Sequence, residues 1–238
     1  MPELETLLPH TKDLGGGFLV RRSLPSVQRQ AVGPFVFFDH FGPIAAKPED
    51  NFDVRPHPHI GLATVTYLFE GAMMHRDSTG VVQRIETGAI PELHLPGATV
   101  RVLVGRAFGL VSPVRTLSPT LYVDLDLGAT GHAAITVPEA ADERALYGVD
   151  NGFALDGIAV PAHTMVVLEP GAEPVLTAPQ GGRVVLIGGA PLGHRHMVWN
   201  FVSSRRERIA QAQDDWEAQS MGQVPGETEF IPLPPRRA

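Results

Sequence analysis

The chain has 238 residues, of which 43% are hydrophobic and 19% charged, and its formal net charge at pH 7 is −7. This length and composition are those of a soluble globular protein with one large or two small domains. The acidic balance argues against a surface for direct nucleic-acid binding. The chain has no cysteine, so any metal has to be held by histidine nitrogen or carboxylate oxygen.

Short strands separated by turns are the main pattern along the chain. Its 25 glycines and 22 prolines favour many turns over long helices. Runs that alternate or are rich in β-branched residues predict strands at 17–20, 34–38, 64–69, 99–104, 121–127, 163–168 and 182–187. This succession is typical of a β-sandwich or β-barrel, so we predict an all-β protein.

A segment with two prolines suggests a domain boundary, and a helix is expected near the end of the chain. The segment 112–119 carries two prolines between strand-like runs, and we place there a boundary between residues 1–114 and 115–238. Near the end, Ser204 and Glu207 have the spacing of a capping box. Ile209, Ala212 and Trp216 then recur on one helical face, which predicts a helix that packs on a barrel.

Two histidines one residue apart, His57 and His59, lead into the run expected to form a strand at 64–69. In an extended segment residues i and i+2 point to the same side, so both imidazoles would face one spot. Pro56 and Pro58 remove backbone donors and favour an edge or a strand entrance. The pair is half of a metal site; the other interpretation is two surface side chains, or one core histidine beside an exposed neighbour.

The residues around this pair resemble the first cupin motif of the pirin family. The matching segments are 39–43, 57–61, 64–67, 70–71, 75–78, 199–204 and 224–234, so the resemblance extends over nearly the whole length of the chain. The resemblance implies two tandem antiparallel cupin β-barrels, the first in residues 1–114 and the second, with a C-terminal helix, in residues 115–238. It also implies one metal, usually iron, in the N-terminal barrel.

In the pirin family two histidines of the first motif are joined by a histidine and a glutamate of a second motif. His57 and His59 match the first two positions, and the resemblance implies Fe(II), with Mn, Ni, Co or Cu as alternatives. It further implies an activity of the quercetin 2,3-dioxygenase type on a flavonol-like substrate. The alternative is a non-catalytic, iron-dependent regulatory or redox-sensing protein, so whether the protein is an enzyme stays open.

The second ligand motif does not follow where the resemblance places it. After Ile90 the chain passes at Pro91 to what resembles the far end of the first barrel, and the missing part amounts to roughly 40 to 60 residues, several short strands with their turns. Either the sequence omits an internal segment that the molecule contains, or the protein is a deletion variant. We favour an omitted segment, because losing half a barrel exposes core and strand edges.

The remaining candidate ligands have weaker patterns. Glu92 and His94 offer a carboxylate and an imidazole at strand spacing, but the matching family segment is an ordinary loop, so we do not assign them to the metal. His194 and His196 repeat the spacing of the first pair and are interpreted as surface or hydrogen-bonding residues. The others are interpreted as turn, hydrogen-bonding or unpartnered residues: Asp39, His40, His75, Asp77, His132 and His163.

The start of the chain has no basic segment followed by an apolar one, and no apolar run is long enough to cross a bilayer. We therefore expect a cytoplasmic protein with no membrane partner. No sequence motif points to a protein partner, and we expect a monomer.

Overall fold

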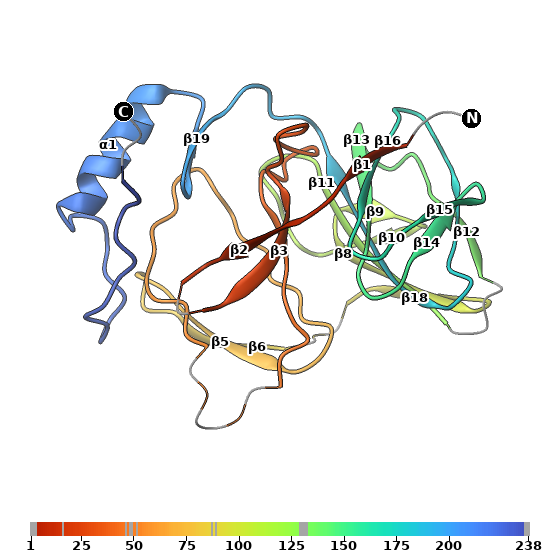
Figure 1. Cartoon of the computed structure of the whole chain (residues 1–238), viewed down its shortest axis with the longest axis horizontal. Helices are drawn as coiled ribbons and strands as arrows, with labels where there is room; N and C mark the ends of the chain where they lie inside the picture. The colour runs from red at the N-terminus through yellow and green to blue at the C-terminus, as the bar shows by residue number, and fades with distance from the viewer. Residues whose placement is uncertain are drawn as a thin grey trace. The chain divides into compact units, whose positions relative to one another are not determined.

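The computed structural model describes residues 4–15, 17–45, 47, 50, 52–86, 88, 90–128 and 133–235. Strands dominate this part of the chain (Figure 1), in agreement with the predicted all-β class. Contacts between residues divide the chain into two compact units. Unit 1 is Met1–Lys12, Leu19–Ala45 and Ile90–Leu192; unit 2 is Asp13–Phe18, Ala46–Ala89 and Gly193–Ala238.

Unit 1 is built on an antiparallel seven-stranded sheet with the order β1-β16-β13-β18-β11-β8-β7. The strands are β1 (Glu5–Leu7), β16 (Met165–Leu168), β13 (Glu143–Gly148), β18 (Gly182–Gly189), β11 (Thr120–Leu127), β8 (Ala98–Val104) and β7 (Glu92–Leu95). Residues of β11 face β18 in an unbroken register from Thr120 opposite Gly189 to Leu127 opposite Gly182. Strand β11 is thus paired with β18 on one side and with β8 on the other, which explains why residues 120–127 form a strand.

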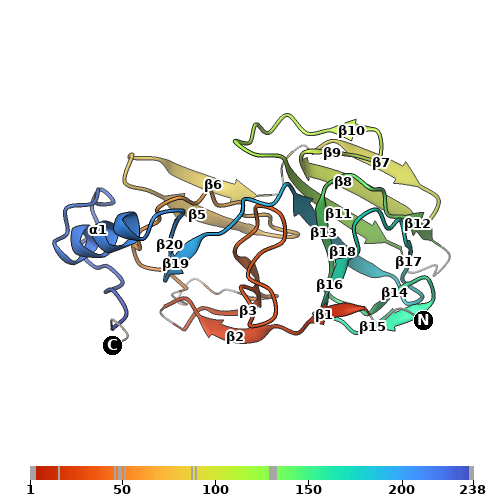
Figure 2. The ribbon, with the colours of Figure 1, turned by 90° about the horizontal axis from the view of Figure 1, so that it is seen from above.

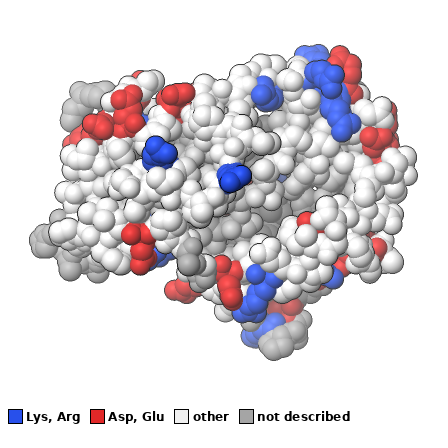
Figure 3. All heavy atoms as spheres, turned by 180° about the vertical axis from the view of Figure 1, so that it is seen from behind, with Lys and Arg blue, Asp and Glu red and all other residues white. Residues whose placement is uncertain are grey.

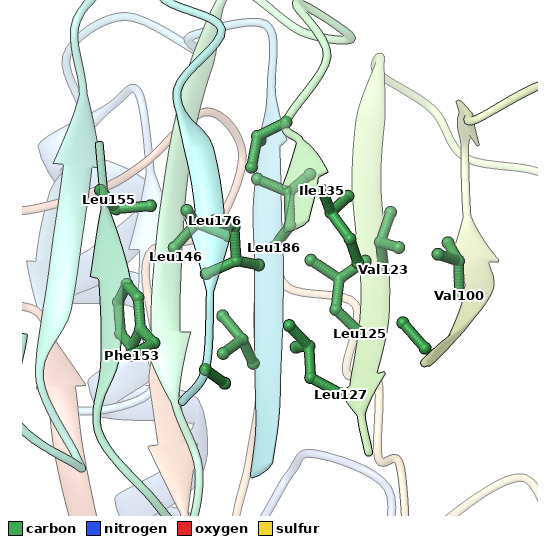
Figure 4. Close-up of a cluster of buried hydrophobic side chains, with 14 of the residues drawn as sticks. Val100, Val123, Leu125, Leu127, Ile135, Leu146, Phe153, Leu155, Leu176 and Leu186 are labelled. Carbon is green, nitrogen blue, oxygen red and sulfur yellow. The ribbon is translucent and has the colours of Figure 1, made fainter. Parts of the chain in front are cut away.

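A four-stranded sheet with the order β12-β17-β14-β15 supplies the other wall of the unit 1 core. Its strands are β12 (Ala134–Thr136), β17 (Val175–Thr177), β14 (Phe153–Leu155) and β15 (Ile158–Val160). Figure 4 shows Leu125 and Leu186 of the larger sheet in one cluster with Phe153 and Leu176 of the smaller one. Each such side chain, once buried, stabilises the unit by about 1.5–3 kcal/mol.

Shorter pieces complete the strands of the described chain. A three-stranded sheet has the order β2-β3-β4, with β2 (His10–Asp13), β3 (Leu19–Leu24) and β4 (Phe38–His40). A small pair joins β9 (Arg106–Ala107) to β10 (Leu110–Val111).

Unit 2 contains two hairpins and the helix. The hairpins are β5 (Ala72–Arg76) with β6 (Val82–Glu86), and β19 (His196–Val198) with β20 (Phe201–Ser203). The helix α1 (Arg206–Glu217) lies beside the second hairpin in Figures 1 and 2. Ile209, Ala212 and Trp216 bury their side chains against Phe201, so the predicted buried face of the helix is confirmed.

Four of the predicted strands are confirmed, those at 99–104, 121–127, 163–168 and 182–187. The strand expected at 17–20 begins at Leu19 and continues to Leu24. Of the strand expected at 34–38, only Phe38 belongs to one, because Phe35 closes a local bridge with Val32.

Two local predictions are wrong. Residues 64–69 form no strand, because no described segment pairs with them and a strand needs partner hydrogen bonds. The helix starts at Arg206 after Arg205, and no side chain caps it, so the capping box of Ser204 and Glu207 does not form. Instead, the Oγ of Ser203 accepts a hydrogen bond from the backbone N–H of Arg205 at 3.1 Å.

The two compact units do not follow the predicted division at residue 114. The seven-stranded sheet pairs β8, which precedes this position, with β11, which follows it. The assignment of residues 1–114 and 115–238 to separate cupin domains therefore stays a prediction. In the described part of the chain, no helix combines the length and the apolar character that a membrane span requires.

Candidate metal centre

His57 and His59 lie in unit 2, in a strand-free segment that is attached to the hairpin β19–β20. Ile60 forms a parallel bridge with Phe201, and its carbonyl accepts a hydrogen bond from the N–H of Val202 at 3.1 Å. Gly61 follows with φ +65°, and a Cβ there would collide with the carbonyl oxygen of Val202. Only glycine allows this close approach, which fixes the end of the histidine segment.

The structure brings the two imidazoles together. The ring centroids of His57 and His59 lie 5.0 Å apart and the ring planes make an angle of 65°. The Nδ1 of His57 lies 2.9 Å from the carbonyl oxygen of Arg55. If this nitrogen carries the ring proton, the bond fixes the tautomer in which Nε2 has a free lone pair, as metal-binding histidines require.

Electrostatics keep His59 in the form that can bind a metal. Neighbouring groups displace water from its ring, and this desolvation, followed by the repulsion of His57, lowers the pKa of His59 to about 4. The residue nevertheless remains exposed to solvent. At neutral pH the imidazole is therefore uncharged and has a lone pair available for a metal.

The described residues do not complete a metal site around this pair. Among them, no group of three or more histidine, aspartate or glutamate side chains is placed to hold a metal ion. Iron sites of the facial type need two histidines and a carboxylate, and the family's set has four ligands. The pair therefore fits half of the expected centre and does not by itself fit a tightly held iron.

Glu92 and His94 are engaged within unit 1. The carboxylate of Glu92 lies 3.2 Å from the Nε2 of His94 and 3.2 Å from the Nε of Arg101 on β8. The Nδ1 of His94 lies 3.2 Å from the hydroxyl of Thr99. These contacts describe an exposed cross-strand cluster between β7 and β8, and they give no support to replacement ligation.

A cluster that the sequence did not predict joins His40, Tyr147 and His163 in unit 1. The Nδ1 of His40 lies 3.0 Å from the Tyr147 hydroxyl, and the His40 and His163 rings are 5.5 Å apart. Burial, then Arg21, then His163 lower the pKa of His40 to about 4. Burial raises the pKa of Tyr147 to about 12. No local motif signals this cluster, since His40 lies more than 100 residues before Tyr147 and His163.

The other candidates have mainly structural contacts. Asp39 accepts two hydrogen bonds from the guanidinium of Arg22, at 2.7 and 2.6 Å. Asp77 accepts from the backbone N–H groups of Thr79 and Val81, as expected of a turn residue beside His75. His132 lies outside the described residues. On the face in Figure 3, basic and acidic side chains are interspersed in a mostly uncharged surface.

Comparison with known proteins decides the family. The model of the pirin family matches residues 17–94, and that of the pirin C-terminal cupin domain matches residues 122–222. A pirin-like protein from Caulobacter vibrioides is 36% identical, over 94% of this chain and 96% of that protein. The chain belongs to the pirin family. This chain has the two-domain cupin fold that the sequence motifs implied.

Two further proteins that resemble this pirin-family chain are named as quercetin 2,3-dioxygenases. A protein from Pseudomonas aeruginosa, named "Putative quercetin 2,3-dioxygenase PA1205", is 30% identical over 90% of this chain and 84% of that protein. The crystal structure of a quercetin 2,3-dioxygenase from Acinetobacter baumannii superposes with a TM-score of 0.87 at 26% identity. It covers 99% of this chain and 97% of that one.

The alignment with the Caulobacter protein is longer than this pirin-family chain. It has 281 positions, whereas 94% of 238 residues is about 224, so about 57 positions have no residue here. The Pseudomonas alignment has 267 positions for about 214 residues of this chain, which leaves about 53. Both lengths agree with the 40 to 60 residues expected to be missing; their place after Ile90 stays a prediction.

Proposed function

We propose that this protein is a pirin-type bicupin of the quercetin 2,3-dioxygenase class, with a flavonol-like substrate and a divalent metal, Fe(II) first among the candidates. The observation that carries the proposal is the pair of adjacent imidazoles, His57 and His59, which the resemblance of their motif to the pirin family assigns to a metal. Similarity to the Acinetobacter quercetin 2,3-dioxygenase over nearly the whole chain supports the class of reaction.

The contribution of the two histidines follows from their contacts. The carbonyl of Arg55 orients His57, and desolvation keeps His59 uncharged. Because the described residues offer no third ligand, the proposal requires further ligands from the roughly 57 positions that the Caulobacter relative has and this chain lacks. We derive no catalytic step from two ligands alone.

The second candidate function is a non-catalytic, iron-dependent regulatory or redox-sensing protein. It would need the same further ligands to hold its iron, because the described residues offer no third ligand beside His57 and His59. Oxygen consumption with a panel of flavonols would favour the enzyme. Binding to a protein partner that changes with the oxidation state of iron would favour the sensor.

Metal analysis of the purified protein tests the enzyme proposal. With the ligands of the missing segment present in the molecule, we expect bound metal in the wild type and its loss in His57→Ala, with His94→Ala as a matched control that keeps the wild-type content. His94 is an exposed histidine whose contacts are within unit 1. If the wild type and His57→Ala are equally free of metal, the dioxygenase proposal is wrong.

A graft separates a missing segment from a wrong family function. Inserting the additional segment of the Caulobacter relative between Ile90 and Pro91 should raise metal content to about one ion per chain, dependent on His57. An intact mass near 25.6 kDa for the native protein would exclude an omitted segment. In that case the metal content of the graft would show how much metal binding the shorter chain has lost.

A further inference from the structure

Unit 1 holds a cavity of about 550 Å³ beside the strand ends where β8 leads into β9 and β11 begins. Its walls are the hairpin β9–β10, the segment 112–119 with its two prolines, and the connection before β13 that contains residues 140–142. Figure 2 shows the hairpin beside β8. The described residues that line the cavity all belong to unit 1, so the histidine pair of unit 2 contributes none of them. Sites for small molecules commonly have volumes of about 300–1,000 Å³.

Hydrogen bonds hold the proline-bearing wall at both ends. At its start, Ser112 donates twice, from its N–H to the carbonyl of Gly105 at 2.9 Å and from its hydroxyl to the carbonyl of Leu103 at 2.6 Å. At its end, the carbonyl of Pro119 accepts a hydrogen bond from the N–H of Ala190 at 3.0 Å. The cavity is therefore formed before any ligand arrives, which reduces the ordering cost of binding.

Two opposite charges line the cavity without a partner among the described residues. Arg106 lies on β9, and Asp142 lies immediately before β13. Within the described chain neither side chain makes a hydrogen bond or an ion pair, and the two do not pair with each other. The low-dielectric walls of a concave site concentrate the field of such charges. One molecule that carries both an anionic and a cationic group can therefore satisfy the two side chains together.

Apolar side chains line the same cavity. Val111 is 56% exposed and Val114 is 52% exposed. Ala140 and Ala141 are half-buried and pack against the core of unit 1. An apolar ligand group that covers these side chains removes them from water, which favours binding. The ligand that fits the cavity therefore combines two opposite charges with an apolar body.

We propose that this cavity binds a small zwitterion with an apolar side chain, either a free amino acid or a short peptide. Arg106 holds the carboxylate, because a planar guanidinium can donate two parallel hydrogen bonds to its oxygens. Asp142 accepts hydrogen bonds from the ammonium group. Thr116, which also lines the cavity, has a hydroxyl that can donate or accept. The site is independent of the dioxygenase proposal, since it uses neither a metal nor a histidine.

Calorimetric titration of the full chain with leucine and with leucyl-leucine tests the site. We expect one ligand per chain, and the tighter ligand identifies the source, a free amino acid or a peptide. Arg106→Gln and Asp142→Asn should each weaken binding of that ligand by about five- to twentyfold. Arg208→Gln, which removes an exposed arginine of α1, is the matched control. It should bind as the wild type does, and so should His57→Ala.

Capped ligands assign each charge to its partner. The N-acetyl derivative of the tighter ligand has no ammonium group, so Asp142→Asn should leave its affinity unchanged while Arg106→Gln still weakens it. The amide derivative has no carboxylate, and the two variants should exchange these effects. Each derivative should bind more weakly than the zwitterion, because it keeps only one of the two charged contacts.

Two results would overturn the zwitterion site. One is the absence of binding by both ligands at millimolar concentration to a protein whose circular dichroism shows that it is folded. The other is equal affinity in the wild type, Arg106→Gln and Asp142→Asn. A loss of affinity in Asp142→Asn that persists with the N-acetyl derivative would contradict the assignment of the ammonium group to Asp142.

Discussion

The two units differ in how far their strands are paired and covered. In unit 1, 21 described residues, most of them from the two larger sheets, form one buried cluster (Figure 4). In unit 2, the cluster under α1 consists of four buried residues, and every residue of β5 is exposed. The comparison shows that one chain can close a hydrophobic core in one part and leave strands uncovered in another.

The difference teaches what a β-rich sequence requires to become a strand. Residues 121–127 and 64–69 both alternate or are rich in β-branched residues, but only the first run has partner strands on both sides. Val65 in the second run is 49% exposed. A strand is stabilised by cross-strand pairs and burial, so β propensity without a partner strand leaves residues 64–69 outside any sheet.

The largest predicted loss of stability should separate the unit 1 core from the segment 64–69. Leu125→Ala removes a fully buried side chain of unit 1 and should lower the free energy of unfolding by about 2–5 kcal/mol. Val65→Ala should change it by about 0.5 kcal/mol or less, because that side chain is already half in water. Urea denaturation of both variants measures the difference. Equal losses would show that 64–69 is buried in the native protein.

The attachment of the histidine segment should depend on one glycine. Gly61→Ala forces a Cβ against the carbonyl of Val202 at a positive φ, and should cost about 2–4 kcal/mol of stability. Gly71→Ala has a similar φ, +80°, with nothing within 4 Å, and should cost only about 1 kcal/mol. Thermal unfolding compares the two. A harmless Gly61→Ala would mean that residues 60–61 do not lie against β20.

Acid should destabilise both units, and unit 1 more strongly. The pKa values of His40 and His59 are each lowered to about 4, below the ordinary value of 6.5, so the unfolded chain binds more protons between these limits. The contribution of these two neutral histidines to the free energy of unfolding is therefore fully present above pH 6.5, and it is lost as the pH drops toward 4.

The two histidines should contribute unequally to that loss. His40 is half-buried and contacts Tyr147 and His163, whereas His59 is exposed, so solvent screens its charge. Between pH 6.5 and 4 the free energy of unfolding should fall by about 1–3 kcal/mol less in His40→Gln than in the wild type. In His59→Gln the difference from the wild type should be smaller. Urea unfolding at several pH values measures both slopes, and an unchanged slope in His40→Gln would show that His40 is not buried as a neutral group.

The smallest contrast concerns two ion pairs. Arg22→Ala breaks a two-point contact with Asp39, in which the arginine side chain is 13% exposed, and should cost about 1–2 kcal/mol. Arg84→Ala on β6 breaks an exposed pair with Glu86 and should cost less than about 0.5 kcal/mol. Added salt should weaken only the second pair noticeably. A larger cost at Arg84 would indicate that something covers β6.

The sequence predicted those parts of the fold and site that depend on local periodicity. The alternation in 121–127 is a strand, and Ile209, Ala212 and Trp216 form the buried face of a helix. The segment around Ser204 shows the limit of such patterns. Its spacing suits a capping box, but the helix starts one residue later, because the Ser203 hydroxyl bonds the backbone before α1.

By itself the sequence determined the family, the all-β class and the nearness of His57 to His59, because residues two apart in an extended chain project to the same side. Only the tertiary structure decided that 64–69 has no partner strand and that His40 meets Tyr147 and His163. It also decided that the rings of His194 and His196 lie with their centroids 4.7 Å apart. These facts depend on which distant segments pair and pack, and no local pattern contains that information.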